Sequence, residues 1–206
     1  ALHRKIADKT HEATLVSLYN GLRKIAFHVN IVPYCDFFHV GTSRELLSNI
    51  STLSRTAKKY GFENFSREYH SPEAMLDDAF VFNSSTYSSR VIAERGSMIE
   101  ASHINGPVRL RGSNMLVGLP GSARTPIVLN EEICLVCLPI GNSDWVSVLY
   151  GLDDDFKGRV GAGTGCSFLN TPIERWLARH KLPQSAIWSR SAEKTLWEAR
   201  MWVAGG

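Results

Sequence analysis

The sequence predicts an α+β protein built around a short left-handed parallel β-helix. Three observations support this prediction: a six-residue repeat of aliphatic residues, compact residues at a second repeating place, and capped or amphipathic segments on either side. The aliphatic repeat consists of Ile92, Met98, Ile104, Leu110 and Leu116. The compact repeat consists of Gly96, Ser102, Val108 and Asn114. Hexapeptide periodicity is typical of parallel β-helices, in which three short strands close each coil.

The N-terminal piece combines helices and short strands. Residues 10–26 carry an apolar stripe at helical spacing, which predicts an amphipathic helix. Residues 27–40 are rich in β-branched and aromatic residues and contain Pro33, which predicts two short strands. Thr42 and Glu45 form a capping box, in which each side chain hydrogen-bonds the backbone of the other, so a second helix is expected from there to about Gly61.

The β-helix is expected to begin after an irregular polar stretch at 61–80. We therefore place a domain boundary near residue 70, with an N-terminal α/β piece at 1–70 and the β-helix with its cover at 71–206. Five hexads form fewer than two coils and cannot close their own ends. The flanking segments 81–91 and 122–138 are expected to extend the stack.

The sequence of the C-terminal part predicts a hairpin and helices that cover the β-helix. Apolar strands at 130–140 and 144–152 flank a turn sequence. Residues 153–167 form a loop by composition. A helix follows, with Thr171 as its N-cap, Pro172 at its first position and Pro183 beyond its end.

Composition limits the classes of function. The chain has 206 residues and a formal net charge of +3 without any long basic run, so we expect no nucleic-acid partner. No apolar run reaches the length of a membrane span, so no membrane association is expected. The four cysteines show no disulfide framework, which favours a reducing, cytoplasmic location. Cys134 and Cys137 lie in one apolar strand and are expected to point to opposite faces as core residues.

Five segments, in order, resemble the L-fucose-1-phosphate guanylyltransferase (GDP-L-fucose pyrophosphorylase) family, whose members occur alone or fused to an L-fucokinase. The segments are DFFHVGTSRELL at 36–47, SMIEASHINGPVRLRGSNMLVGLP at 97–120, VLYGLDDDFKG at 148–158, GCSFLNTPIERWLARHKLPQSAIW at 165–188 and EKTLWEARMWV at 193–203. The resemblance implies a nucleotidyltransferase parent that joins L-fucose 1-phosphate to GTP and releases pyrophosphate in cytoplasmic fucose salvage. The parent would use GTP and Mg²⁺.

This chain departs from the complete family because it lacks a glycine-rich nucleotide loop before residue 36. The glycine-dense stretch at 158–167 is not placed between a strand and a helix start, as a phosphate-binding loop requires. We therefore expect a portion of the parent that contains the β-helix, holds no cofactor and does not catalyse alone. It would serve as a scaffold between domains, and nucleotide-sugar substrates would be bound through the parent's missing domain.

No catalytic residue or metal ligand is assigned, but five residues are candidates for substrate binding. His39, Gly41, Thr42 and Ser43 lie where a helix opens, and free amides at a helix N-terminus can bind an anion. The resemblance implies that this site could face the sugar phosphate, and that Lys157 could neutralise it. A capped helix and a solvated lysine are the alternative interpretations of these residues.

Two further clusters have both a functional and a structural interpretation. The three consecutive carboxylates at 153–155 could bind a divalent cation, but a solvated turn is favoured. Four tryptophans could stack on a sugar or anchor the C-terminal segments to the core, and anchoring is favoured. These tryptophans are Trp176, Trp188, Trp197 and Trp202.

Two rival functions stay open, and self-association through the β-helix is a further expected partnership. A hexapeptide acyltransferase would be a trimer with coenzyme A between protomers, and acyl transfer would depend on His103. A sugar-binding module would bind fucose or GDP-fucose in this chain alone, through an exposed aromatic patch.

Overall fold

The computed structural model describes residues 9–31, 33, 39–50, 68–70, 74–86, 90–121, 126–141, 144–161, 165–189, 193–202 and 204–205. The chain divides into two compact units, 1–37 and 38–206, which are described separately. In the first unit, α1 spans Lys9–Leu22 and confirms the predicted helix, although it ends earlier than residue 26. Residues 27–31 and 39–40 form no strand, so the predicted strands are wrong there. A β-branched run favours a strand only where a neighbouring strand is available to pair with it.

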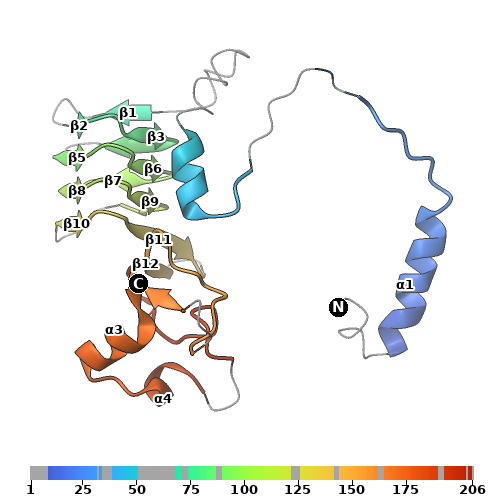
Figure 1. Cartoon of the computed structure of the whole chain (residues 1–206). Coiled ribbons are helices and arrows are strands. Elements are labelled where there is room, and N and C mark those ends of the chain that lie inside the picture. Colours follow the sequence, from blue (N-terminus) through green and yellow to red (C-terminus); the bar gives the residue numbers. More distant parts are fainter. Residues whose placement is uncertain are drawn as a thin grey trace. The chain divides into compact units, whose positions relative to one another are not determined.

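The second unit is built on a parallel β-solenoid of about three coils, which confirms the predicted α+β fold with a β-helix (Figure 1). The chain visits three sheets in turn, and all pairs between coils are parallel. The first sheet contains β1 (Glu68–His70), β4 (Ser84–Thr86) and β7 (His103–Ile104). The second contains β2 (Met75–Leu76), β5 (Val91–Ala93), β8 (Val108–Leu110) and β10 (Ile127–Leu129). The third begins with β3 (Phe80–Phe82), β6 (Met98–Glu100) and β9 (Met115–Val117).

The predicted six-residue register is correct for one part of the solenoid and wrong for another. Ile104, Leu110 and Leu116 are fully buried in the central core, as expected. Ile92 is only half-buried, and Met98 is buried in a different cluster on the outer side of its strand. The core positions are instead Ala93 and Ile99. Adjacent strand residues point to opposite faces, so a shift of one residue reverses the assignment.

The shift arises at one corner of the coil, between the third sheet and the first. Ile99 and Ile104 are both core residues, but they are only five positions apart instead of six. One coil therefore takes seventeen residues, one fewer than three hexads, and Val91 of β5 pairs with Val108 of β8. This corner is turned by residues with positive φ in successive coils: Asn83 at 45°, Ala101 at 48° and Gly118 at 72°. At Gly118 a Cβ would also collide with the carbonyl oxygen of Cys137.

An antiparallel hairpin ends the stack, as predicted. β11 (Ile133–Pro139) pairs in parallel with β9 and antiparallel with β12 (Trp145–Gly151), and β15 (Ala204–Gly205) lies on the other side of β12. Cys134 and Cys137 of β11 are both buried, and they belong to different core clusters. The prediction of two core cysteines on opposite faces is therefore confirmed.

The C-terminal segments form a third apolar cluster below the hairpin. They comprise β13 (Ser167–Phe168), β14 (Thr171–Pro172), α3 (Ile173–His180) and α4 (Gln184–Ile187). The predicted Thr171 N-cap is wrong, because Pro172 occupies the cap position without a side-chain bond and Thr171 pairs with Phe168 in a short strand. Trp188 is buried and donates its indole N–H to the Thr195 carbonyl at 2.7 Å, so it anchors this cluster as expected.

Residues 43–50 form a helix that packs on the outside of the solenoid (Figure 1). Leu47 and Ile50 are buried against Met98 and Met115. We expected this helix in the N-terminal piece, whereas its apolar face is covered by the solenoid; its predicted end near Gly61 lies outside the described residues. The predicted irregular stretch at 61–80 already contains β1, β2 and the start of β3. The domain boundary near residue 70 stays a prediction.

Candidate functional site

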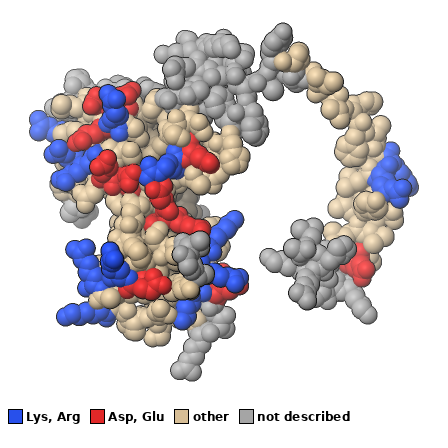
Figure 2. All heavy atoms as spheres, in the orientation of Figure 1, with Lys and Arg blue, Asp and Glu red and all other residues tan. Residues whose placement is uncertain are grey.

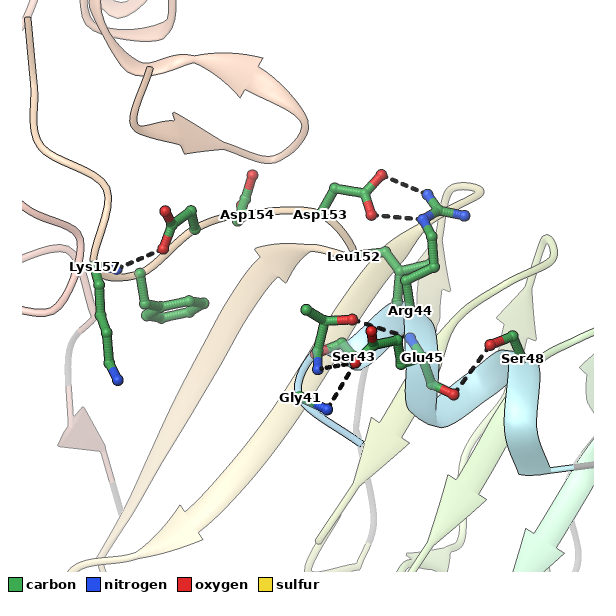
Figure 3. A pocket seen from close by; sticks show the side chains of 12 residues that line it. Gly41, Ser43, Arg44, Glu45, Ser48, Leu152, Asp153, Asp154 and Lys157 are labelled. Atoms are coloured by element: carbon green, nitrogen blue, oxygen red, sulfur yellow. Dashed lines mark hydrogen bonds and ion pairs between the residues drawn. The ribbon is translucent and has the colours of Figure 1, made fainter. Parts of the chain in front are cut away.

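A cavity of about 770 Å³ lies between the start of the 43–50 helix and the loop that follows β12 (Figure 3). The cavity is lined by Gly41, Thr42, Ser43, Arg44, Glu45, Ser48, Leu152, Asp153, Asp154, Asp155, Phe156 and Lys157. Four of the five predicted substrate-binding residues are among them. The fifth, His39, lies beside the cavity, with its Nδ1 atom 3.5 Å from Oε2 of Glu45. The structure thus places Lys157 and the helix start on one cavity, although they are more than a hundred positions apart in the sequence.

The helix start is closed by its own capping box. The Glu45 amide donates to Oγ1 of Thr42 at 3.1 Å, and the Glu45 carboxylate accepts from the amides of Gly41 at 2.7 Å and Thr42 at 3.1 Å. The Gly41 amide in particular lowers the pKa of Glu45, because it stabilises the carboxylate. The predicted cap is confirmed. The amides proposed for an external anion already bind a carboxylate of the chain, so an anion here would have to displace Glu45.

Arg44 ties the helix to the loop and to the end of the solenoid. Its Nε and Nη2 atoms donate to the two carboxylate oxygens of Asp153 at 2.5 and 2.6 Å, and Nη2 also reaches Oε1 of Glu132 at 2.6 Å. The two-point contact to Asp153 is the geometry that guanidinium and carboxylate groups favour. Hydrogen bonding to Arg44 lowers the pKa of Asp153, and the pKa of Arg44 is raised in turn. The arginine is therefore already paired.

Asp154 holds the loop in shape rather than facing the cavity as a free acid. Its carboxylate accepts from the amides of Gly151 at 2.6 Å, Leu169 at 2.7 Å and Asn170 at 3.1 Å, and from the Ser167 hydroxyl at 2.8 Å. Since Asp153 binds Arg44 and Asp154 is saturated with donors, the run at 153–155 does not fit a magnesium ion. Within the described residues no group of three or more His, Cys, Asp or Glu side chains is placed to hold a metal.

Tyr150 and Cys134 lie beneath the helix start. The Tyr150 hydroxyl is 3.4 Å from Oγ of Ser43. Burial raises the pKa of Tyr150, and it raises the pKa of Cys134 to about 11. Both groups are therefore neutral at pH 7. Cys134 is an unreactive core thiol rather than a nucleophile.

Lys157 and Phe156 form the other end of the cavity (Figure 3). The Lys157 side chain extends away from Arg44, and among the residues that the structure describes none pairs with its ammonium group. Phe156 stacks on Trp202 with ring centroids 5.8 Å apart and meets Tyr150 edge to face at 5.3 Å. Figure 2 shows both signs of charge interspersed over the face of this unit in view, so that face has no extended field of one sign.

His103, the residue on which the rival acyltransferase hypothesis depends, does not line this cavity. His103 is in β7, and its Nδ1 atom is 2.8 Å from Oγ of Ser85 on the neighbouring coil.

The sequence prediction did not include Arg44 and Phe156 among the cavity residues, and it did not foresee that Glu45 would occupy the amides at the helix start. The capping box contained the signal for Glu45, since its carboxylate is expected to bind these amides. No local pattern marks Arg44, because its partner Asp153 is 109 positions away.

A parallel β-solenoid closed by a hairpin, with a cavity beside its covering helix, places the chain in the class of β-solenoid proteins. Comparison with known families is more specific: the fucose pyrophosphorylase domain matches residues 5–204. The chain belongs to the fucose pyrophosphorylase family. The resemblance noted from the sequence is thereby confirmed.

Two curated relatives carry related names. The L-fucokinase/L-fucose-1-P guanylyltransferase of Bacteroides fragilis is 26% identical over 160 residues, which cover 78% of this chain and 16% of that protein. The fucose-1-phosphate guanylyltransferase of Mus musculus is 25% identical over 146 residues, which cover 69% of this chain and 24% of that protein. The chain therefore spans between a sixth and a quarter of these relatives. No solved structure matches it. Among the described residues, no helix is both long and apolar enough to cross a membrane.

Proposed function

We propose that this chain is the β-solenoid portion of a fucose-1-phosphate guanylyltransferase and acts there as a scaffold rather than as the catalyst. The parent reaction joins L-fucose 1-phosphate to GTP, with Mg²⁺, and releases pyrophosphate in the cytoplasm. The observation that carries the proposal is the family match over 5–204, together with relatives named for this reaction. The family match favours this function over the acyltransferase.

The cavity between the 43–50 helix and the 152–157 loop supports a subordinate role in binding. Arg44 is paired with Asp153 and Glu132, so among the described residues that line the cavity Lys157 is the cation that can meet a phosphate of a nucleotide sugar. The amides of Gly41 and Thr42 would contact the ligand only if the Glu45 carboxylate moved. Ser43 already lines the cavity, and His39 lies next to Glu45. We therefore expect the chain alone to bind GTP and L-fucose 1-phosphate weakly and to show no turnover.

The test compares the product of the whole open reading frame that encodes this chain with the chain alone. Pyrophosphate release from GTP and L-fucose 1-phosphate is expected from the former only. An inactive whole product, or an open reading frame that starts at residue 1, would overturn the assignment. Calorimetry of the chain alone should show no micromolar dissociation constant, and sedimentation should show whether the solenoid self-associates.

A further inference from the structure

We propose that the outer face of the second sheet binds the same face of a second copy of this chain, about a two-fold axis. The strands of this sheet are stacked in the order β2, β5, β8 and β10, and all of them belong to the unit 38–206. The inference does not depend on the parent's reaction. It names the face through which the solenoid pairs with itself.

The second sheet differs from the third in what lies over its outer face. On the third sheet, Leu47 of the 43–50 helix packs in one cluster with Met98 and Met115. Among the described residues, no helix lies over β2, β5, β8 and β10 (Figure 1). At the two ends of this uncovered face, Met75 is 61% exposed and Val128 is 51% exposed. Single exposed apolar residues are common, and what distinguishes these two is their place in an ordered row of side chains.

Two rows of side chains cross the outer face of the second sheet. The first row is defined by the strand register and consists of Met75, Ile92, Arg109 and Val128. The second row lies two positions further along each strand and consists of Asp77, Glu94, Arg111 and Asn130. Between the rows, Ala93, Leu110 and Leu129 point into the central core, so both rows point outward. Backbone hydrogen bonds continue the register into the second row, since the Glu94 amide donates to the Leu110 carbonyl at 3.0 Å.

Each row becomes its own complement when the order of the coils is reversed. A two-fold axis along the strands, between β5 and β8, places β2 opposite the partner's β10 and β5 opposite the partner's β8. Met75 then meets the partner's Val128, which buries two exposed apolar side chains. Glu94 meets the partner's Arg111, which pairs opposite charges. Because a two-fold interface is isologous, each of these contacts is made twice.

The remaining positions of the two rows also accept each other. Ile92 lies under the methylene stem of the partner's Arg109, and the Asp77 carboxylate meets the amide of the partner's Asn130. Within the two rows, therefore, no position sets like charges against each other. Charge complementarity of this kind selects the partner and its orientation.

The charged groups of the second row are accessible. A hollow of about 600 Å³ is lined by Glu94, Arg109, Arg111, Asn130 and Glu131. Arg109 reaches Oε1 of Glu94 at 3.4 Å, and the other oxygen of that carboxylate accepts no hydrogen bond from a described residue. Arg111 forms no ion pair within the part of the chain that the structure describes. Both groups can therefore bond to a partner without breaking a contact of their own chain.

The face is small, so the pairing is expected to be weak. Four strands spaced about 4.8 Å apart give a face of only about 15–20 Å along the stack. Such a face buries less than the roughly 800 Å² per partner of a standard interface. We therefore expect a reversible dimer with a dissociation constant of about 10–100 μM.

Sedimentation equilibrium of the chain at about 1–300 μM tests the pairing. Arg111→Glu sets two carboxylates against each other at both contacts and should weaken dimerisation at least about tenfold, as should Glu94→Arg. The double variant Glu94→Arg/Arg111→Glu restores opposite charges and should return the dissociation constant to within about threefold of the wild type. Arg175→Glu reverses an exposed charge on α3 and is the matched control, which should dimerise as the wild type does.

The same ion pairs can be tested without any substitution. About 0.5 M NaCl screens charges and should weaken the wild-type dimer several-fold, so the test does not depend on a variant that fails to fold. Circular dichroism checks that each variant keeps the fold of the wild type.

Four results would overturn the inference. They are a chain that stays monomeric at about 300 μM, a trimer, a dimer that Arg111→Glu or salt leaves intact, and a loss that the double variant does not repair. Pyrophosphate release by the product of the whole open reading frame is a separate measurement and bears on the proposed function alone.

Discussion

The solenoid interior and the region around the cavity are stabilised in opposite ways. In the interior, buried aliphatic side chains of successive coils lie above one another, as Val91 and Val108 do. Around the cavity, charged side chains hold backbone segments that are distant in sequence, as Arg44 and Asp154 do. The interior excludes water, whereas Arg44 and Asp153 are each about half exposed. The difference indicates that the solenoid supplies most of the stability and the polar contacts mainly fix the position of the loop.

The strongest test of this comparison removes a core side chain. Leu110 is fully buried in the central cluster, so Leu110→Ala is expected to lower the free energy of unfolding by about 3–4 kcal/mol through lost burial and an unfilled cavity. Urea unfolding followed by circular dichroism measures the change. Val128→Ala on the outer face, where the residue is 51% exposed, is the control and should cost well under about 1 kcal/mol. Similar losses of unfolding free energy for both variants would contradict the conclusion that the buried interior supplies most of the stability.

The next effect is expected at Asp154, the most heavily bonded polar group of the cavity region. Asp154→Ala removes the acceptor of four donors and should cost about 2–3 kcal/mol. Hydrogen exchange should also become faster at the amides of Leu169 and Asn170. Asp155→Ala removes one bond on an exposed turn and serves as the control. If the two variants lose equal stability, Asp154 does not organise the loop.

A smaller effect is expected at the cap of the 43–50 helix. Thr42→Ala removes the acceptor of the Glu45 amide and should cost about 1 kcal/mol. Thr42→Ser keeps the hydroxyl and should stay close to the wild type in urea unfolding. Equal destabilisation by serine and alanine would show that the methyl group matters here and the cap does not.

The smallest effect is expected at the ion pair of Arg44 and Asp153. Because both side chains are about half exposed, Arg44→Gln should cost only about 0.5–1 kcal/mol at pH 7. The folded-state pKa of Asp153 is lowered, so the pair stabilises the fold above the unfolded pKa of about 3.9. That contribution is lost as the pH falls through the lower folded-state value. Unfolding free energies of wild type and variant should therefore converge near pH 2, and a difference that persists there would contradict the assignment.

The parts of the fold that the sequence predicts are those with a local pattern. The helices at 9–22, 43–50 and 173–180, the hairpin and the opposite orientation of Cys134 and Cys137 follow from local patterns. These patterns are the periods of 3.6 and 2, which short segments display by themselves. The six-residue rhythm identified the solenoid but misplaced Ile92 and Met98, because one corner is a residue shorter than the repeat assumes. Strands of two or three residues, such as β1 and β2, are too short to show any period.

The substrate-binding role of the candidate residues stays a prediction, but the structure brings four of them, which no local pattern connects, to one cavity. Lys157 and the Thr42 cap do line one cavity. Their chemistry was less predictable, since a capping box says that a helix begins and does not say that its own Glu45 fills the anion position. The Arg44 pair with Asp153 spans 109 residues, and only the folded backbone determines it.

The hairpin at the end of the stack has a consequence for how the protein behaves at high concentration. A bare coil would offer a row of unpaired amides and carbonyls on which the end of another molecule could add in register, and repetition of that step would give a fibre. On the third sheet, β12 runs against the direction of the coils and β15 lies on its outer side, so a further parallel coil finds no matching strand. Growth by end-to-end addition is thereby blocked on that sheet.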